Sequence, residues 1–237
     1  MLPLKVSEAQ ARDLIRAWYQ RQWLAPNTLK SKALTDTAKG IYLPYWTFDA
    51  NAHALWTAES GEYYYTREGG KQVRRVRWRP ASGELAHVFD DDLVPASVGV
   101  SARQLKGVEP FPTTVGLIPY DAGFLAGWTV ERYQIDLVSA ATKSRQQMEA
   151  ELRRLCGEQV PGDTYRNLDV NATFVDQKFK HILVPIWLLT YVYGSRSYQV
   201  VVNGVTGKIS GERPWSWIKI TLLVIVVLLV LYVINSN

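Results

Sequence analysis

The C-terminal segment constrains this chain more than any other part of its 237 residues. Residues 220–234 read ITLLVIVVLLVLYVI, and only Thr221 and Tyr232 carry a polar side-chain atom. Together with residues 217–219, the segment is long enough to cross the roughly 30 Å hydrocarbon core of a bilayer as one helix. The alternative, a buried helix or strand of a soluble protein, rarely stays apolar for so long. We therefore predict a transmembrane anchor over residues 215–237.

Residues suited to a membrane surface flank this apolar segment. The expected interface residues are Trp215, Trp217, Lys219 and Tyr232. Amphipathic rings prefer the headgroup level, and a lysine near a helix end extends its ammonium toward the headgroups. Lys208 and Arg213 also precede the segment, whereas residues 235–237 carry no charged side chain. The positive-inside rule therefore predicts a single-pass, tail-anchored membrane protein whose body faces the cytoplasm, with membrane lipid as one partner.

Composition indicates a folded body and limits its chemistry. Hydrophobic residues make up 47% and charged residues 21% of the chain, which is typical of a folded protein with one large domain or two small ones. The single cysteine, Cys156, excludes an intrachain disulfide and a zinc ribbon within these residues, and we expect a buried thiol. The net charge of +5 is compatible with anionic lipid or nucleic acid as a ligand but diagnostic of neither.

An eight-residue pattern occurs twice in the body. Residues 39–46 read KGIYLPYW and residues 180–187 read KHILVPIW, so lysine, isoleucine, proline and tryptophan coincide at four of the eight positions. A helix-like segment precedes each copy, and strand-like segments follow it. We expect the paired prolines and tryptophans to anchor the cores of two repeats; they are Pro44, Trp46, Pro185 and Trp187. A proline within a strand also favours an edge position or a bulge.

This duplication predicts an α+β fold. We expect two duplicated modules, each a helix packed on a small antiparallel sheet, followed by one C-terminal transmembrane helix. The expected divisions are residues 1–95 for the first module, 96–125 for a connector rich in proline and glycine, 126–214 for the second module and 215–237 for the anchor. Each predicted helix lies in the same module as the strands that follow it in sequence.

Local signals predict where several elements begin and end. Residues 7–10 (SEAQ) form a capping-box pattern, which predicts the start of the first helix. The second helix is expected over about residues 142–155, with Gly157 as the residue that ends it. Residues 67–70 (REGG) lie between two strand-like runs and predict a β-hairpin.

Catalytic and metal-binding signals are weak in this sequence. It contains no glycine-rich phosphate loop, nucleophile elbow or metalloprotease helix motif. The nearest metal-binding constellation is His87 with the carboxylates of residues 90–92, and an enzyme hypothesis would nominate His87, Asp90 and Asp92. Three adjacent carboxylates suit a hard cation such as Ca²⁺, but they lack the spaced ligands of a known calcium loop, which favours a solvated acidic turn. We assign no catalytic residue, metal or cofactor and expect a protein that is not an enzyme.

A basic strand is the strongest polar feature of the body. In residues 73–79, strand alternation places Arg75, Arg77 and Arg79 on one face and turns Val76 and Trp78 to the other. Guanidinium groups pair well with phosphates, so the arginine row suits lipid headgroups or nucleic acid. The favoured alternative is an exposed strand whose charges protect it against pairing with other strands.

Three segments resemble a family of bacterial membrane proteins. These are residues 42–50 (YLPYWTFDA), residues 93–97 (LVPAS) and the stretch from VNG at 202–204 to GERP at 211–214. They look like members often labelled as zinc-ribbon or primosomal-protein-N′-like, and the resemblance covers nearly the whole chain. Typical members carry a cysteine-rich zinc ribbon ahead of this region, which this chain lacks. The resemblance implies an adaptor associated with membrane-organising proteins, such as those with a stomatin/flotillin-like (SPFH) domain.

Two functional hypotheses follow from these features. The leading hypothesis is a non-enzymatic membrane-anchored adaptor or scaffold that binds a protein partner, or a second copy of itself, at the cytoplasmic face. The alternative is a phosphate-binding module that recognises anionic lipid or nucleic acid through Arg75, Arg77 and Arg79, with nucleic acid the less favoured ligand.

Overall fold

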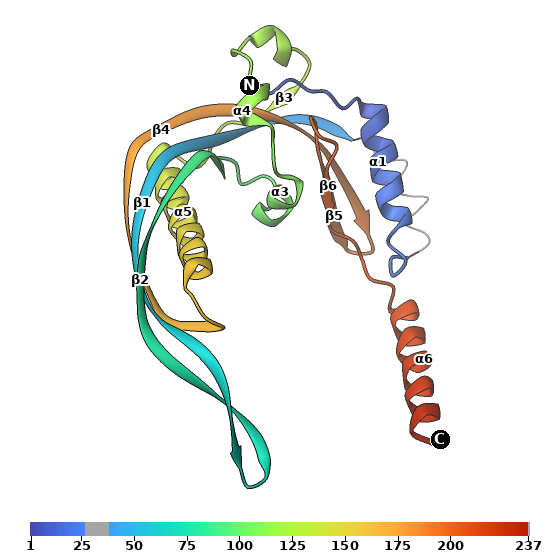
Figure 1. Ribbon diagram of the computed structural model, residues 1–237. Helices are drawn as coiled ribbons and strands as arrows, with labels where there is room; N and C mark the ends of the chain where they lie inside the picture. Colours follow the sequence, from blue (N-terminus) through green and yellow to red (C-terminus); the bar gives the residue numbers. More distant parts are fainter. Residues whose placement is uncertain (27–37, 237) are drawn as a thin grey trace. The chain divides into compact units, whose positions relative to one another are not determined.

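The computed structural model describes residues 1–26 and 38–236 and shows a mixed fold of helices and antiparallel sheet with one C-terminal apolar helix (Figure 1). The helices are α1 (Glu8–Gln20), α3 (Ala102–Val108), α4 (Thr113–Gly116), the 3-10 helix η1 (Ala122–Leu125), α5 (Leu137–Gln159) and α6 (Trp217–Ser236). The strands are β1 (Lys39–Glu68), β2 (Lys71–Pro95), β3 (Thr129–Val130), β4 (Thr164–Tyr193), β5 (Arg196–Asn203) and β6 (Ile209–Gly211). Their order is β2-β1-β4-β5-β6, and β3 pairs with β1 in parallel. Residues 27–37 of the first expected module and residue 237 of the anchor lie outside the described residues.

The chain divides into two compact units whose segments alternate along the sequence. The first unit comprises Met1–Pro44, Ser97–Gln134 and Leu183–Asn237, and the second comprises Tyr45–Ala96 and Ile135–Ile182. The expected boundaries at 95, 125 and 214 follow sequence order, whereas each unit collects separated segments. The difference arises because β1 and β4 are long strands, and each contributes one part to each unit.

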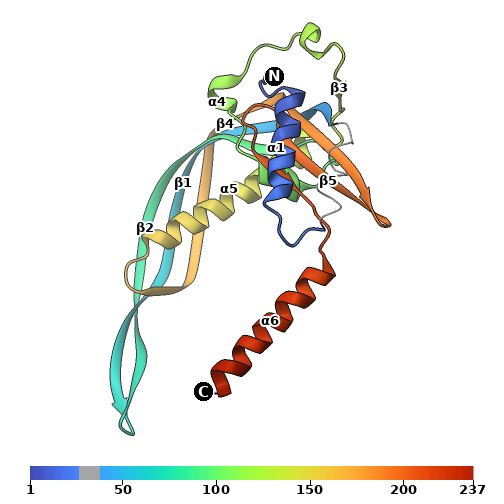
Figure 2. The same cartoon turned by 90° about the vertical axis from the view of Figure 1, so that its right-hand side faces the viewer.

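Helix α5 packs on one face of the strands in the second unit. In Figures 1 and 2, α5 lies along the inner side of the curved ribbons of β1, β2 and β4. Alternate β1 side chains are buried toward this core, namely Ala50, Ala52, Ala54, Trp56 and Ala58. The Trp56 ring lies over Gly83 of β2, where an added Cβ would approach the ring to 2.5 Å. Small residues therefore make room for both the helix and one large indole.

Helix α1 packs in the first unit on the strands that follow the second repeat copy. Its buried residues Ala11, Ile15 and Tyr19 share a core with Trp187 and Leu189 of β4. Helix α5 instead shares the core of the second unit with Trp46. Helix α1 therefore packs on strands of the second expected module, whereas α5 packs both on the β1–β2 hairpin of the first and on β4, the strand that follows it in sequence.

Each repeated tryptophan fixes the start of one helix. The indole N–H of Trp187 donates to the carbonyl of Val6 at 2.8 Å, and Val6 precedes the N-cap residue of α1. The indole N–H of Trp46 donates to the carbonyl of Ile135 at 3.0 Å, and Ile135 precedes the N-cap residue of α5. Both rings are largely buried.

The helix ends show which local signals were reliable. The capping box before α1 is confirmed, because Ser7 Oγ accepts from the Gln10 amide and Gln10 Oε1 accepts from the Ser7 amide. Helix α5 begins earlier than predicted, after the N-cap Asp136. The prediction that Gly157 ends α5 is wrong. Gly157 lies inside the helix, where the absence of a side chain leaves room for Tyr165, whose hydroxyl would lie 2.4 Å from an added Cβ.

Candidate functional site at the membrane-proximal helix

Helix α6 is the one described helix that is long and apolar enough to cross a membrane. Its apolar window, Trp217–Asn235, is not buried inside the protein at any point. Leucine, valine and isoleucine side chains face outward along its whole length. A helix that is apolar on all sides requires apolar surroundings, and its backbone groups are satisfied within the helix, as a bilayer core demands. Tyr232, at the far end, is 71% exposed.

The start of α6 is held by the segment that follows α1. The Nζ atom of Lys219 donates to the carbonyls of Trp23 and Ala25, both at 2.8 Å. The Ser216 amide donates to the Leu24 carbonyl, also at 2.8 Å. We expected Lys219 to extend toward lipid headgroups, but its ammonium instead satisfies two backbone carbonyls within the first unit. Helix α6 is thereby connected to the folded body by three specific hydrogen bonds.

Three exposed tryptophans and two basic residues belong to the start of α6, to the segment just before it or to the segment bonded to Lys219, and we call them the collar: Trp23, Arg213, Trp215, Trp217 and Lys219. The three indoles are 61%, 52% and 78% exposed in that order. The Arg213 guanidinium lies 5.0 Å from the centre of the Trp215 ring. Exposed indoles beside cations suit the headgroup layer, where rings are half-solvated and guanidinium meets phosphate. The sequence did not indicate Trp23, because its relation to the start of α6 depends on a hydrogen bond from Lys219 to its backbone carbonyl.

The predicted arginine row lies on an exposed part of the β1–β2 hairpin. Strand register places Arg75 opposite Tyr64 and Arg77 opposite Glu62. Arg75 forms an ion pair with Glu68, and Arg77 lies over the Tyr64 ring at 5.4 Å from its centre. Arg79 lies 4.0 Å from Glu62. Each arginine of the row therefore has a partner within its own hairpin.

The side chains nominated for metal binding do not converge. Asp92 accepts a hydrogen bond from Ser144 of α5 at 2.5 Å, and His87 packs edge-on against Phe89. Asp90 instead lies close to Asp49 and Asp91. The three residues thus have separate surroundings, because a register shift after Phe48 interrupts the alternation of side chains.

An acidic cluster at this bulge contains a lysine. Carboxylate oxygens of Asp49, Asp90 and Asp91 lie within 4.8 Å of one another. Lys180 Nζ lies 2.8 Å from Asp91 and 3.6 Å from Asp49, and the hydrogen bond to Asp91 is the main cause that raises the pKa of Lys180. Asp91 is buried and has the left-handed φ of 53°. The ammonium of Lys180 therefore supplies positive charge where a cation would otherwise be expected.

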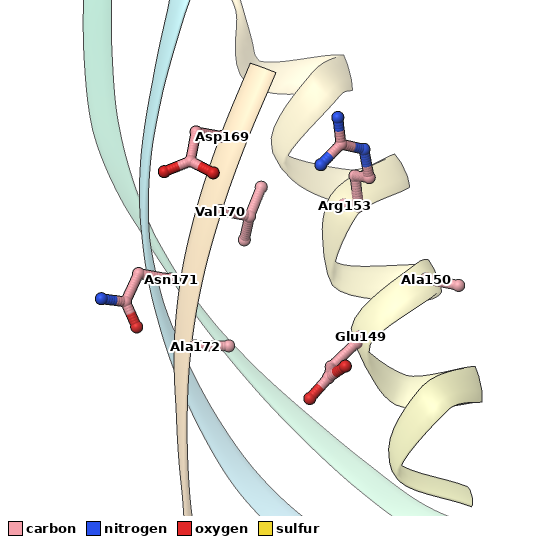
Figure 3. Close-up of a pocket in the computed structure, with 7 residues that line it drawn as sticks. All are labelled: Glu149, Ala150, Arg153, Asp169, Val170, Asn171 and Ala172. Atoms are coloured by element: carbon pink, nitrogen blue, oxygen red, sulfur yellow. The ribbon is translucent and has the colours of Figure 1, made fainter. Parts of the chain in front are cut away.

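A hollow of about 610 Å³ lies between α5 and β4 in the second unit (Figure 3). The residues that line it are Glu149, Ala150, Arg153, Asp169, Val170, Asn171 and Ala172. Asp169 and Asn171 point away from the helix in Figure 3, so the carboxylates of Glu149 and Asp169 do not face a common point. Arg153 donates to the Leu168 carbonyl at 2.7 Å. The lining therefore gives no paired acid and base.

Burial raises the pKa of the thiol of Cys156, the single cysteine of the chain, and so disfavours its reactive thiolate form.

No family model and no solved structure matches the chain. A curated protein of Bacillus subtilis strain 168, the uncharacterized protein YdjG, is 22% identical over 217 residues. The similarity covers 91% of this chain and 63% of that relative, so the chain spans less than two thirds of the curated protein it matches. Because the relative's name gives no activity, the zinc-ribbon resemblance and the functional hypotheses stay predictions.

Proposed function

We propose that this protein is a non-enzymatic membrane-anchored adaptor that binds a protein partner at the cytoplasmic face. The observation that carries the proposal is the direct attachment of the apolar helix α6 to a folded body through Lys219 and Ser216. Such an attachment keeps the body at the bilayer surface. The excess of basic residues before α6 supports the cytoplasmic orientation.

The outer face of the second unit's sheet is the surface we propose for the partner. This face consists of β1, β2 and β4 side chains that alternate with those packed against α5. It exposes Leu55, Val88 and Val175 at 55%, 67% and 53%. A protein interface favours apolar side chains of this kind among polar ones. The resemblance noted above suggests a stomatin/flotillin-like (SPFH) protein as the partner, and a second copy of this chain is the competing occupant.

The strand edges of the second unit are less suited to partner binding. Strand β2 contains Pro80, which has no amide hydrogen, and the bulge at Asp91. Strand β4 contains two residues with left-handed φ, Asn167 and Asp176, at 54° and 52°. Prolines and irregular backbone interrupt the regular row of donors and acceptors that an added strand needs. We therefore favour the sheet face over its edges.

The test is capture of partners from detergent-solubilised membranes with the full chain as bait. A stoichiometric partner should co-purify with the wild type and be lost from the double variant Leu55→Glu and Val88→Glu. Val115→Glu is the matched control, because Val115 is 90% exposed and belongs to the first unit. A monodisperse monomer with no stoichiometric partner would refute the proposal, as would equal capture by all three proteins.

We also infer that the two halves descend from one duplicated module. Support comes from the eight-residue repeat and from the matching roles of Trp46 and Trp187, which each bind the residue before a helix N-cap. Exchanging Trp46 and Trp187 for phenylalanine one at a time should loosen the first turn of α5 and of α1, respectively, in hydrogen exchange. Loosening of the other helix in either variant would contradict this assignment.

A further inference from the structure

The end of the β1–β2 hairpin extends beyond the third strand of its sheet. We call residues 62–79 the ribbon. The amide of Asp163, the residue just before β4, donates to the Gly61 carbonyl at 2.9 Å, and the ribbon begins immediately after Gly61. The ribbon strands pair with each other as far as Glu68 and Lys71, and the Tyr63 amide also donates to the Asp163 carboxylate at 2.7 Å. Gly69 and Gly70 form its turn with φ of 58° and 80°, as the sequence predicted.

The ribbon carries a concentrated positive charge. It contains six basic residues and two acidic ones, in a chain whose total net charge is +5. The two carboxylates, Glu62 and Glu68, are already engaged by Arg79 and Arg75. The remaining basic residues have no carboxylate partner among the described residues; they are Arg67, Lys71, Arg74 and Arg77. Exposed cations without internal partners attract an anionic surface over about one Debye length.

Tyrosine rings hold two of these arginines. Arg74 lies over the Tyr63 ring at 4.4 Å, and Arg77 lies over the Tyr64 ring at 5.4 Å. A guanidinium that stacks through its flat face keeps its in-plane N–H donors for phosphate oxygens. A two-stranded ribbon alone is at best marginally stable in water, and these stacked pairs stabilise the strands while leaving the donors available.

Both faces of the ribbon combine aromatic and basic residues, with Arg74 beside Tyr63 and Tyr65 on one face and Lys71 and Arg77 with Tyr64 on the other. Residues directly opposite each other in an antiparallel pair share a face, so Tyr63 lies with Val76, and Tyr65 with Arg74. Tyr65 is 61% exposed. Exposed tyrosines beside cations suit the headgroup layer of a bilayer. Base stacking on nucleic acid is less favoured, because a guanidinium already covers the Tyr63 ring face.

We propose that the ribbon enters the headgroup layer of anionic lipid and binds phosphates on both of its faces, through Arg74 on one face and Lys71 and Arg77 on the other. The anchor α6 keeps the chain at a bilayer, which raises the effective concentration of lipid phosphate around the ribbon. The ribbon differs from the arginine row predicted from sequence, because two arginines of that row are paired with glutamates. The proposal is independent of the protein partner on the outer sheet face.

The test measures co-flotation of the full chain, held in nanodiscs of phosphatidylcholine, with added vesicles. Vesicles that contain phosphatidylglycerol should bind the wild type, vesicles of phosphatidylcholine alone should not, and added salt should weaken the binding. The triple variant Lys71→Gln, Arg74→Gln and Arg77→Gln should bind on the order of 100-fold more weakly, since each basic residue near an anionic surface contributes about fivefold. The matched control is Arg12→Gln, Arg16→Gln and Arg103→Gln, which removes the same charge outside the ribbon.

A variant that should bind more tightly distinguishes the proposal from misfolding, because a misfolded protein would only lose binding. Glu62→Gln with Glu68→Gln frees two arginines and removes two negative charges, so binding should tighten about tenfold. Equal binding by the triple variant and its control would overturn the proposal. Binding of single-stranded RNA without binding of phosphatidylglycerol vesicles would also overturn it, in favour of a nucleic-acid site. Competition by inorganic phosphate at concentrations equal to those of the lipid would assign a free phosphate ligand in place of a membrane surface.

Discussion

Lys180→Met should reveal how strongly the acidic cluster depends on one ammonium group. The Asp91 side chain is 2% exposed, and its carboxylate lies 2.8 Å from Lys180 Nζ. Removing one partner of a buried ion pair costs roughly 3–5 kcal/mol, because the remaining charge stays buried without compensation. The Lys180 side chain is 45% exposed, so water reaches the site and the cost falls toward that of a surface pair. We expect a loss of about 2 kcal/mol in the free energy of local unfolding.

A double-mutant cycle tests the cause of this loss. Asp91→Asn removes the buried charge and keeps a residue type that tolerates the left-handed backbone at φ 53°. If Lys180 acts by compensating Asp91, the double variant Asp91→Asn and Lys180→Met should lose about 1–2 kcal/mol less than the sum of the single variants. Losses that add within about 0.5 kcal/mol would refute the reasoning.

Native-state hydrogen exchange of the full chain in nanodiscs is the suitable assay, because it reports opening around the bulge without requiring global unfolding. Amides of Ala50 and Ala52 lie beside the register shift, and amides of β5 in the first unit provide the internal reference. Added Ca²⁺ should stabilise Lys180→Met, in which the carboxylates lack a cation, and leave the wild type unchanged. Equal stabilisation of both proteins would show that the cluster takes a metal ion despite Lys180.

Three further perturbations have definite expected outcomes. Gly83→Ala places a Cβ 2.5 Å from the Trp56 ring and should lower the unfolding free energy by about 1–3 kcal/mol in a thermal melt, whereas exposed Ser82→Ala should not. Lys219→Met removes two hydrogen bonds at the start of α6, so the Ser216 amide should exchange about tenfold faster. Burial lowers the pKa of His181 below its usual 6.5, so the stability it contributes is present above pH 6.5 and is lost as pH falls through the lower folded-state pKa. His181→Gln should flatten that pH dependence in denaturation measured between about pH 7 and 5.

Features encoded over a few residues could be predicted from the sequence. The capping box before α1 involves residues three apart, and the turn at Gly69 and Gly70 needs only two left-handed positions. Helix α6 is apolar at almost every position, so its character is independent of any partner. In each case the physical cause lies within one turn, one loop or one continuous segment.

The long β1 strand could not be predicted because its buried face is made of weak strand formers. Its inward side chains over residues 50–58 are four alanines and Trp56. Alanine has low strand propensity and gives little hydrophobic contrast with its polar neighbours. The cause is tertiary, since α5 packs close to this face and the alanines leave room for the helix and for the Trp56 ring. Trp23 in the collar was missed for a similar reason, because its carbonyl meets Lys219 across 196 residues of sequence.

The strands on which α1 and α5 pack are likewise determined by contacts between residues far apart in sequence. Trp187 binds the residue before α1 across 181 positions of sequence, and Trp46 binds the residue before α5 across 89 positions. Periodicity and capping patterns act within a helix and cannot specify such a partner. Strand β4 runs through both units, which divide it at Leu183, so it contributes to the core under α5 and to the core under α1. A chain read as two modules in sequence order therefore identifies the helices and hairpins but not the full set of strands on which each helix packs.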